Sequence, residues 1–448
     1  MNYNPMEVEQ KLTQKYKRII KRLDTIKVNG KVTDVIGLVI VSVGPNVSLG
    51  EMCIIVDKFG NEVCRAEVVG FKEGKVMSIA LGEVHSISPS CEIIASGKSF
   101  TIGVGPELLG RVIDGFGNPM DGKGEIVCPS YVTVHNEPPN PLERKRIAEP
   151  LQTGVRSIDG LLTVGKGQRI GIFAGSGVGK SVTLGMIARN TNADVNVITL
   201  IGERGREVRE FIEKDLGPEG LKRSVVIVAT SDKSALLRMK GAFIGTTIAE
   251  YFRDTGKDVV LMMDSVTRFA MAQREIGLTI GEPPTTKGYT PSVFSILPKL
   301  LERAGCGEGG SITGFYTVLV DGDDMTEPIA DATRSILDGH IVLSRKIANK
   351  GQFPAVDPLQ SVSRVMPDIV SSDHKARAAA FNEILATYNE AEDLINIGAY
   401  VKGSNPQIDH ALSKIKFLRS FLRQDMKEKA DFNATVNRLN EIIEKPLG

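Results

Sequence analysis

A glycine-rich segment between two apolar runs carries the residues best suited to chemistry. It reads Ala174-Gly-Ser-Gly-Val-Gly-Lys-Ser181 and lies between Gln168–Phe173 and Val182–Ile187, which is the order of a strand, a tight turn and a helix. Such a turn directs backbone N–H groups and a helix N-terminus at one point, where a polyphosphate binds. There Lys180 would reach the β- and γ-phosphates, and Ser181 would hold Mg²⁺ through its hydroxyl. The expected nucleotide contacts are Gly175, Ser176, Gly177, Val178, Gly179, Lys180, Ser181 and Val182.

The motif has one departure from the usual pattern and one alternative explanation. The first position of the pattern is Ala174 instead of glycine, although the turn glycines that follow are intact. An accidental glycine turn would have similar composition, but the flanking strand and helix patterns favour a phosphate site.

A second chemical motif follows the next apolar run. Glu203 and Arg204 come directly after Val195–Ile201, so they are expected at the carboxyl edge of a parallel sheet, near the phosphate site. A carboxylate there polarises an attacking water, and an arginine steadies phosphate charge. A surface ion pair with a neighbouring arginine is the alternative explanation of this motif.

Two further residues are candidates for the same site. Asp264 ends the apolar run Asp258–Met263 and is placed to hold Mg²⁺, which predicts a strand next to that of the phosphate loop. Arg364 follows Pro354–Ser363. It would be either an arginine that offsets charge on the transferring phosphoryl group or a structural arginine bonded to nearby carbonyls.

The elements that position these residues follow from periodicity. Residues 150–350 alternate strand-like and helix-like segments, which predicts a parallel sheet with crossover helices. The strand candidates are Arg169–Phe173, Val195–Ile201, Ser224–Ala229, Asp258–Met263 and Ser311–Val320. The strand pattern ends after Gln352–Pro358, and residues 368–448 are expected to be helical, for example over His374–Asn389 and Asp409–Gln424.

Short β-rich runs precede this region. Between Lys27 and Gly97 they recur about every ten residues with Gly, Asn and Asp turns between them, which predicts a small barrel or sandwich. The runs are Thr33–Val43, Glu51–Val56, Glu62–Phe71, Lys75–Ile79 and Cys91–Ala95. Gly103–Asp121 is expected to be a turn-rich link, and Pro138–Pro141 a stiff crossing into the next domain.

The N-terminal segment has the pattern of an amphipathic helix. Between Met6 and Leu23 the apolar residues are three or four apart, and the other face carries six basic residues, from Lys11 to Arg22. This pattern indicates a docking helix for a partner, a helix that binds weakly to a membrane surface, or a helix packed on its own body with a solvated basic side.

Composition limits the classes of protein to consider. The chain has 448 residues and a net charge of +1, with no Trp, so neither a general attraction to nucleic acid nor a base-stacking platform is indicated. Its five cysteines are scattered, which favours a reducing compartment. No apolar run is long enough to span a membrane, and no signal peptide is recognised. We therefore expect a cytoplasmic protein.

With these pieces assembled, the chain from about Lys27 onward resembles the rotary hexameric ATPases, which include the ATP synthase subunits and their type III secretion relatives. Within that family it is most similar to the flagellar protein-export ATPases. The segments that carry the similarity are Pro139–Ile147, Phe173–Ser181, Gly202–Phe211, Asp264–Ile276, Lys287–Phe294, Glu302–Gly305, Pro354–Ser363 and Ile397–Ser404.

The resemblance implies a multidomain fold. It comprises a docking helix at 1–24, a small β-barrel at 25–97, a central α/β RecA-like phosphate-loop ATPase core at 98–350 and a C-terminal α-helical domain at 351–448. The resemblance also implies residue roles. Glu203 matches the water-activating carboxylate, Lys180 and Arg204 match phosphate-proximal cations, and Phe353 matches an aromatic ring against adenine. Arg364 matches the finger that one subunit supplies to its neighbour.

Because Glu203 and Arg364 lie on one chain, the resemblance implies a homohexamer with a shared site at every interface. The implied substrate and metal are ATP and Mg²⁺. The implied partners are a regulator or stator protein at the N-terminal helix, a central stalk protein, the export gate and chaperone–cargo complexes. The implied location is the cytoplasm, at the periphery of the inner-membrane export apparatus.

Three alternatives remain at the level of sequence. A virulence type III secretion ATPase would need the same site. A non-catalytic ring subunit is disfavoured by the intact Lys180, Ser181 and Glu203. A hexameric RNA translocase is disfavoured by the near-neutral charge.

The acidic rotor-contact segment of ATP synthase is missing, and Asn389–Ile395 stands in its place.

Overall fold

The computed structural model describes residues 28–82, 87–320, 322 and 324–444, together with Thr13, Tyr16 and Lys17. The chain divides into two compact units, residues 1–98 and 99–448. Apart from those three residues, the helix predicted over 1–24 lies outside the described part of the chain.

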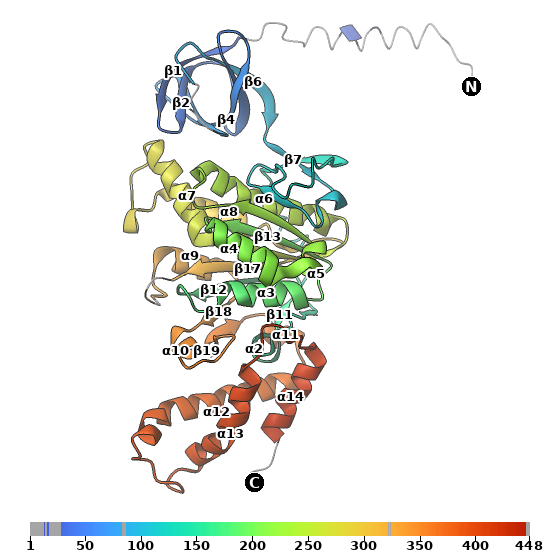
Figure 1. The fold of residues 1–448 in the computed structure, drawn as a ribbon, viewed down its shortest axis with the longest axis vertical. Helices are drawn as coiled ribbons and strands as arrows, with labels where there is room; N and C mark the ends of the chain where they lie inside the picture. Colours follow the sequence, from blue (N-terminus) through green and yellow to red (C-terminus); the bar gives the residue numbers. More distant parts are fainter. Residues whose placement is uncertain are drawn as a thin grey trace, which may run out of the picture. The chain divides into compact units, whose positions relative to one another are not determined.

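The first unit contains a closed β-barrel (Figure 1). Its strands are ordered β1-β2-β5-β4-β3-β6. Alternate side chains such as Val32, Ile40 and Ile55 point inward and are almost fully buried, as expected when a sheet closes on one apolar core. The predicted barrel is therefore confirmed. The strands are β1 (Gly30–Ile36), β2 (Val39–Val43), β3 (Glu51–Val56), β4 (Glu62–Lys72), β5 (Lys75–Ala80) and β6 (Glu92–Ser99).

The β-rich run predicted over Thr33–Val43 is divided in the structure, where it forms most of the hairpin β1–β2. Ile36 pairs with Val39 across a two-residue turn, and Gly37 at that turn has φ +60°, which glycine adopts without strain. Because the residues on both sides of this turn are apolar, the sequence pattern does not show where one strand ends and the next begins.

The cysteines are free thiols, and three of them lie in the barrel core. Burial raises the pKa of the Cys53 and Cys64 thiols to about 11, so both remain protonated at neutral pH. Cys91 is equally buried. Their role is packing, since the thiolate is the reactive form.

The second unit is built around one large, mostly parallel sheet. Its strands are ordered β19-β18-β12-β17-β15-β13-β14-β8, with β16 paired beside β17. Its five predicted strands are confirmed. They are β12 (Arg169–Ala174), β13 (Val195–Ile201), β14 (Ser224–Ala229), β15 (Asp258–Asp264) and β17 (Ser311–Leu319).

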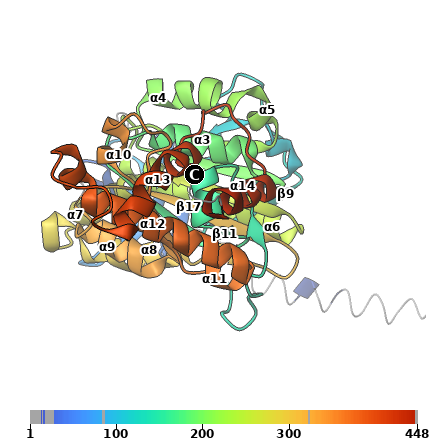
Figure 2. The same ribbon diagram turned by 90° about the horizontal axis from the view of Figure 1, so that it is seen from below.

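Helices cover both faces of this sheet (Figure 2). One side carries α3 (Lys180–Asn190), α4 (Gly205–Glu210) and α5 (Gly217–Lys222); the other carries α6 (Ala235–Asp254), α7 (Val266–Thr279), α8 (Pro291–Leu301) and α9 (Pro328–Ile336). Because both faces are buried, β13 and β14 have no exposed residue, which is why they appear as unbroken apolar runs.

Several strands were missed from the sequence. β18 (Gly339–Leu343) lies before the predicted end of the strand pattern, and the antiparallel edge strand β19 (Val356–Ser363) continues the sheet past it. The segment Gly103–Asp121 is more than a link, because β8 (Val112–Asp114) forms the other edge beside β14. Also, β7 (Thr101–Val104) pairs with β9 (Ser130–Thr133). Short edge strands carry too few residues for periodicity to identify them.

The end of the chain is helical as predicted, with α12 (Ser372–Asn396), α13 (Pro406–Leu422) and α14 (Phe432–Glu444). These helices pack on one another and on α2 (Arg156–Leu161). Phe381, Phe421 and Leu439 are fully buried in a core continuous with that of the sheet. Other short elements are β10 (Pro150–Leu151), β11 (Val164–Gly165), β16 (Gly305–Cys306), α10 (Arg345–Asn349), α11 (Met366–Ile369), η1 (Pro106–Leu108), η2 (Phe211–Leu216) and η3 (Thr286–Gly288). Across the described residues, none of the helices combines the length and the apolar character that crossing a bilayer requires.

Candidate active site: a phosphate loop facing two carboxylates

The phosphate loop connects the end of β12 to the start of α3. Gly177 and Gly179 have φ of +79° and +92°, backbone conformations that glycine alone adopts readily. Gly179 is the N-cap of α3, which begins at Lys180. Because the first amides of a helix have no partner within the helix, the loop can bind an anion.

The other loop residues occupy different depths. Gly175 and Val178 are buried, whereas Ser176 and Gly177 are exposed at the loop tip. Ser181 and Val182 are partly buried in the first turn of α3. Val178 anchors the loop in the apolar core, so the backbone that would hold phosphates rests on a fixed base.

Lys180 lies between the two predicted carboxylates. Its Nζ is 2.5 Å from Asp264 Oδ1 and 3.2 Å from Glu203 Oε1. Asp264 ends β15 and Glu203 follows β13, and these strands are hydrogen-bonded neighbours. The structure thus brings together three residues that are 84 positions apart at most.

One detail of the strand prediction is wrong. Asp264 lies in the same sheet as the phosphate loop, but β15 is not adjacent to β12, because β17 lies between them. The intervening strand supplies a residue that sequence analysis missed. Thr317 Oγ1 donates a hydrogen bond to Asp264 Oδ1 at 2.7 Å, which fixes the buried carboxylate. A threonine near the end of a buried strand was the only sign of it in the sequence.

The protonation of the site follows from burial and charge. Burial lowers the pKa of Lys180, but the attraction of Asp264 and Glu203 outweighs it, so its pKa is above the ordinary value. Burial and then repulsion from Asp264 raise the pKa of Glu203 to about 7, against the opposing effect of Lys180. A carboxyl with a pKa near neutrality is suited to accept a proton during turnover.

Glu207 is a second residue missed by sequence analysis. It lies in the first turn of α4, and its hydrogen bond with Glu203 raises the pKa of Glu203 and lowers its own. Arg204 belongs to this cluster on the outer side. Its guanidinium lies 3.5 Å from Glu207 Oε1, and its side chain is 78% exposed. In the single chain Arg204 therefore forms a surface ion pair with Glu207, and its contact with phosphate stays a prediction.

Arg364 is separated from the phosphate loop in the single chain. It follows Ser363, which pairs with Gly339 at the start of β18, and β18 runs parallel to β12. It therefore lies at the amino edge of the sheet, whereas the loop follows the carboxyl edge. The six residues of β12 place these edges roughly 20 Å apart at about 3.3 Å per residue.

Phe353 lies beside the phosphate loop. A Cβ built on Gly179 would be 3.7 Å from Phe353 Cδ1, and the ring is about half exposed. The backbone N–H of Gln424 donates to the carbonyl of Phe353 at 3.0 Å, which ties this segment to the C-terminal helices. A further contact on the loop comes from Arg345, which donates to the carbonyl of Ser176 at 3.1 Å.

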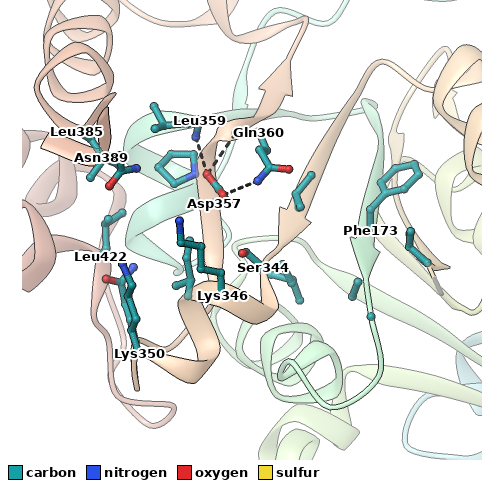
Figure 3. Close-up of a pocket in the computed structure, with 18 of the residues that line it drawn as sticks. Phe173, Ser344, Lys346, Lys350, Asp357, Leu359, Gln360, Leu385, Asn389 and Leu422 are labelled. Carbon is teal, nitrogen blue, oxygen red and sulfur yellow. Dashed lines mark hydrogen bonds between the residues drawn. The ribbon is translucent and has the colours of Figure 1, made fainter. Parts of the chain in front are cut away.

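A cavity of about 420 Å³ adjoins the start of the loop (Figure 3). It lies between β18, α10 and β19 on one side and α12 and α13 on the other, and Ala174 and Gly175 form part of its wall. Glu392 in this wall pairs with Lys350 at 2.7 Å and with Arg419 at 3.1 Å. None of Lys180, Glu203 and Asp264 lines this cavity.

The described residues thus form a phosphate loop whose lysine faces two acids at the carboxyl edge of a parallel sheet, which is the arrangement of a nucleoside-triphosphate hydrolase. Comparison with known proteins agrees. Residues 154–363 match the ATP synthase alpha/beta family, nucleotide-binding domain, and residues 32–97 match the beta-barrel domain of the same family. Residues 370–441 match the T3SS EscN ATPase C-terminal domain.

Individual relatives cover nearly the whole chain. The flagellum-specific ATP synthase of Bacillus subtilis is 58% identical over 431 residues, 96% of this chain and 98% of the relative. The type 3 secretion system ATPase of Xanthomonas euvesicatoria is 52% identical over 415 residues, 93% and 94% of the two chains. The assembled ATPase EscN of enteropathogenic E. coli, in complex with its central stalk EscO, is 46% identical with a TM-score of 0.86. That match covers 92% of this chain and 100% of EscN.

These matches assign the chain to a family. It belongs to the ATP synthase alpha/beta family, in the branch that contains the flagellum-specific ATP synthases and the type III secretion ATPases. It is an ATPase with a barrel, a nucleotide-binding core and a C-terminal helical region, as the sequence predicted.

Proposed function

We propose that this ATPase hydrolyses ATP as a ring of six identical copies and thereby supports flagellar type III protein export. The observation that carries the proposal is the position of Lys180 between Glu203 and Asp264 at the phosphate loop. The 58% identity to a flagellum-specific relative favours export through the flagellum over virulence secretion.

The proposed reaction needs only positioning and charge. The loop amides and Lys180 hold the β- and γ-phosphates. Glu203 orients a water and takes its proton as the water oxygen bonds to the γ-phosphorus and the bond to the bridging β,γ-oxygen breaks. Phosphate and ADP leave. The raised pKa of Glu203 makes its carboxylate a stronger base than an exposed one.

Asp264 and Ser181 are the residues that would hold Mg²⁺. The donor set fits, since a buried carboxylate held by Thr317 and a hydroxyl on the first turn of α3 are both oxygen ligands, which Mg²⁺ prefers. When bound, Mg²⁺ would neutralise charge on the phosphates. Lys180, which contacts Asp264 in this structure, would then contact the phosphates.

Arg364 would complete the site of a neighbouring copy. It lies at the sheet edge opposite its own loop, so it reaches a phosphate site only in trans. Mixing Lys180→Ala protein with Arg364→Ala protein tests this. We expect each to be nearly inactive alone and the mixture to regain turnover at interfaces with an intact loop and an intact finger. A mixture no more active than its components would exclude a shared site.

The proposed partners follow from the relatives. EscN is named in complex with a central stalk protein, and we infer an equivalent stalk for this chain. A regulator or stator protein, the export gate and chaperone–cargo complexes are proposed on the family resemblance alone. So is a cytoplasmic location at the periphery of the inner-membrane export apparatus.

Glu203→Gln tests the function directly. It keeps the shape of the side chain but cannot accept the proton, so we expect turnover to fall by about a hundredfold or more while nucleotide binding persists. In a deletion strain, wild type should restore external filaments and the variant should not. Equal turnover of both proteins would favour a structural ring subunit. Intact filaments with loss of other secretion would place the protein in virulence export.

A further inference from the structure

The backbone that carries Arg364 is held by a polar network at the amino edge of the sheet. The N–H of Arg364 donates to the carbonyl of Asp338 at 3.1 Å. Asp338 links α9 to β18, and its own N–H donates to the carbonyl of Arg169 at 2.8 Å. The first residue of β12 thus fixes the residue to which Arg364 is bonded.

The side chains of Arg169 and Asp338 reinforce this link. Asp338 Oδ2 accepts from Arg169 Nε at 3.0 Å and from its backbone N–H at 3.1 Å, and Oδ1 accepts from Nη2 at 3.1 Å. The arginine side chain is 14% exposed and the aspartate side chain 28% exposed. A bidentate arginine–carboxylate pair in such a setting fixes geometry as well as charge. Arg169 also pairs with Glu302.

Gln168 joins the same network from a fully buried position. Its Nε2 donates to the carbonyl of Asp338 at 3.0 Å and to Ser363 Oγ at 3.1 Å. Ser363 precedes Arg364, and its hydroxyl donates to the carbonyl of Thr163 at 2.9 Å. Ser363, which precedes Arg364, is therefore held through its side chain by Gln168 and Thr163.

Gly339 allows the close approach on which these bonds depend. It has φ +148°, and a Cβ there would lie 2.4 Å from the carbonyl oxygen of Val362 and 3.4 Å from the nitrogen of Arg364. Any other residue would push the end of β19 away from β18. The side chain of Arg364, in contrast, is exposed.

We infer that Asp338, held by Arg169 and Gln168, is a positioning residue for Arg364, so that this network sets the arginine of one copy against the phosphate site of the next. The inference rests on the proposed function, because it needs Arg364 to act in trans. Because its backbone is already fixed, Arg364 loses less backbone freedom when its exposed side chain meets phosphate, which is the benefit of preorganisation.

Asp338→Asn tests the inference, because it weakens the bond to Arg169 and leaves the phosphate loop intact. We expect kcat to fall about tenfold to a hundredfold, the scale that misplacement by an ångström produces, with unchanged binding of a fluorescent ATP analogue. Arg169→Lys should give a smaller loss, since it keeps charge but not the bidentate geometry. Asp331→Asn is the matched control: it removes an exposed pair with Arg334 on α9 and should leave kcat unchanged.

Mixing separates positioning from general damage. If Asp338→Asn impairs the finger, it should regain activity when mixed with Lys180→Ala and show no gain with Arg364→Ala. Gain with Arg364→Ala, loss of analogue binding, or a lowered melting temperature that accounts for the activity loss would each overturn the inference. If Lys180→Ala and Arg364→Ala themselves fail to complement, the shared site of the proposed function is refuted instead.

Discussion

Glu203 and Lys180 show how one neighbourhood sets the chemistry of single residues. The same ion pairs that hold Lys180 leave Glu203 in a buried position beside Asp264, whose charge raises the pKa of Glu203. Glu207 adds a hydrogen bond in the same direction. The cluster therefore places the carboxyl of Glu203, which can take up a proton near neutral pH, next to the charged Lys180. This pair suits a site that binds polyphosphate through the lysine and then transfers a proton to the carboxylate.

This arrangement predicts the pH dependence of the free enzyme. Because the pKa of Glu203 is raised from 4.5 to about 7, the base is protonated below neutrality, and kcat/KM for ATP should fall as the pH drops below about 7. Glu207→Ala removes the hydrogen bond that raises this pKa, so the fall should begin at a lower pH. The measurement is kcat/KM against pH for both proteins.

ATP titrates in a similar range, but its contribution is the same for both proteins. The difference between the two profiles therefore belongs to the enzyme. Superimposable profiles would show that Glu207 does not influence the base.

The helix α6 packs so closely on the sheet that one of its interior positions has room only for glycine. It packs against β13, β14 and β15, and a Cβ on Gly245 would lie 2.0 Å from Thr199 Cγ2 of β13. Glycine normally weakens a helix interior. At Gly245 this cost is offset, because only glycine leaves room for the close packing on β13. Thr199 also donates to the carbonyl of Met262 at 3.1 Å, which joins β13 to β15.

Gly245→Ala should therefore destabilise the protein, by about 1–3 kcal/mol, as overpacking of a filled core does. Denaturant unfolding of the C-terminal unit within the full chain measures the change. Thr199→Ser keeps the hydroxyl and removes the clashing methyl group, so the double variant should recover much of the loss. Strictly additive effects of the two substitutions would contradict the contact.

At the scale of the whole molecule, the proposed site is divided between copies. The phosphate loop and Arg364 lie on opposite edges of one sheet, and strand length prevents them from meeting in one chain. A closed ring of heterologous contacts would bring the two edges together at every interface. Turnover would then depend on assembly of the ring.

Specific activity should for this reason rise with protein concentration and level off when the ring is complete. Sedimentation and turnover measured on the same dilution series should change together. The Arg364→Ala protein should assemble over the same range yet stay inactive. Constant specific activity down to the concentrations at which only monomer sediments would refute a site shared between copies.

The sequence by itself determined the chemistry of the loop and the class of the fold. The residue types of the phosphate loop predict its local structure, because Gly177 and Gly179 allow the tight turn and Lys180 supplies the phosphate contact. The apolar runs of β12, β13, β14, β15 and β17 identify a sheet buried on both faces. Turn spacing likewise predicted a small barrel or sandwich, and the motifs were specific enough to indicate the family, whose fold implied the barrel. These properties depend on neighbours in the chain, which a pattern records directly.

Only the tertiary structure decided which strands are neighbours and which residues meet. β17 enters between β12 and β15 and brings Thr317 to Asp264, and β19 returns antiparallel at the edge and carries Arg364 away from its own loop. Neither follows from periodicity, because strand order and register are set by long-range packing and hydrogen bonding across the sheet. The network of Arg169, Gln168 and Asp338 depends on that register, so no local pattern could have predicted it.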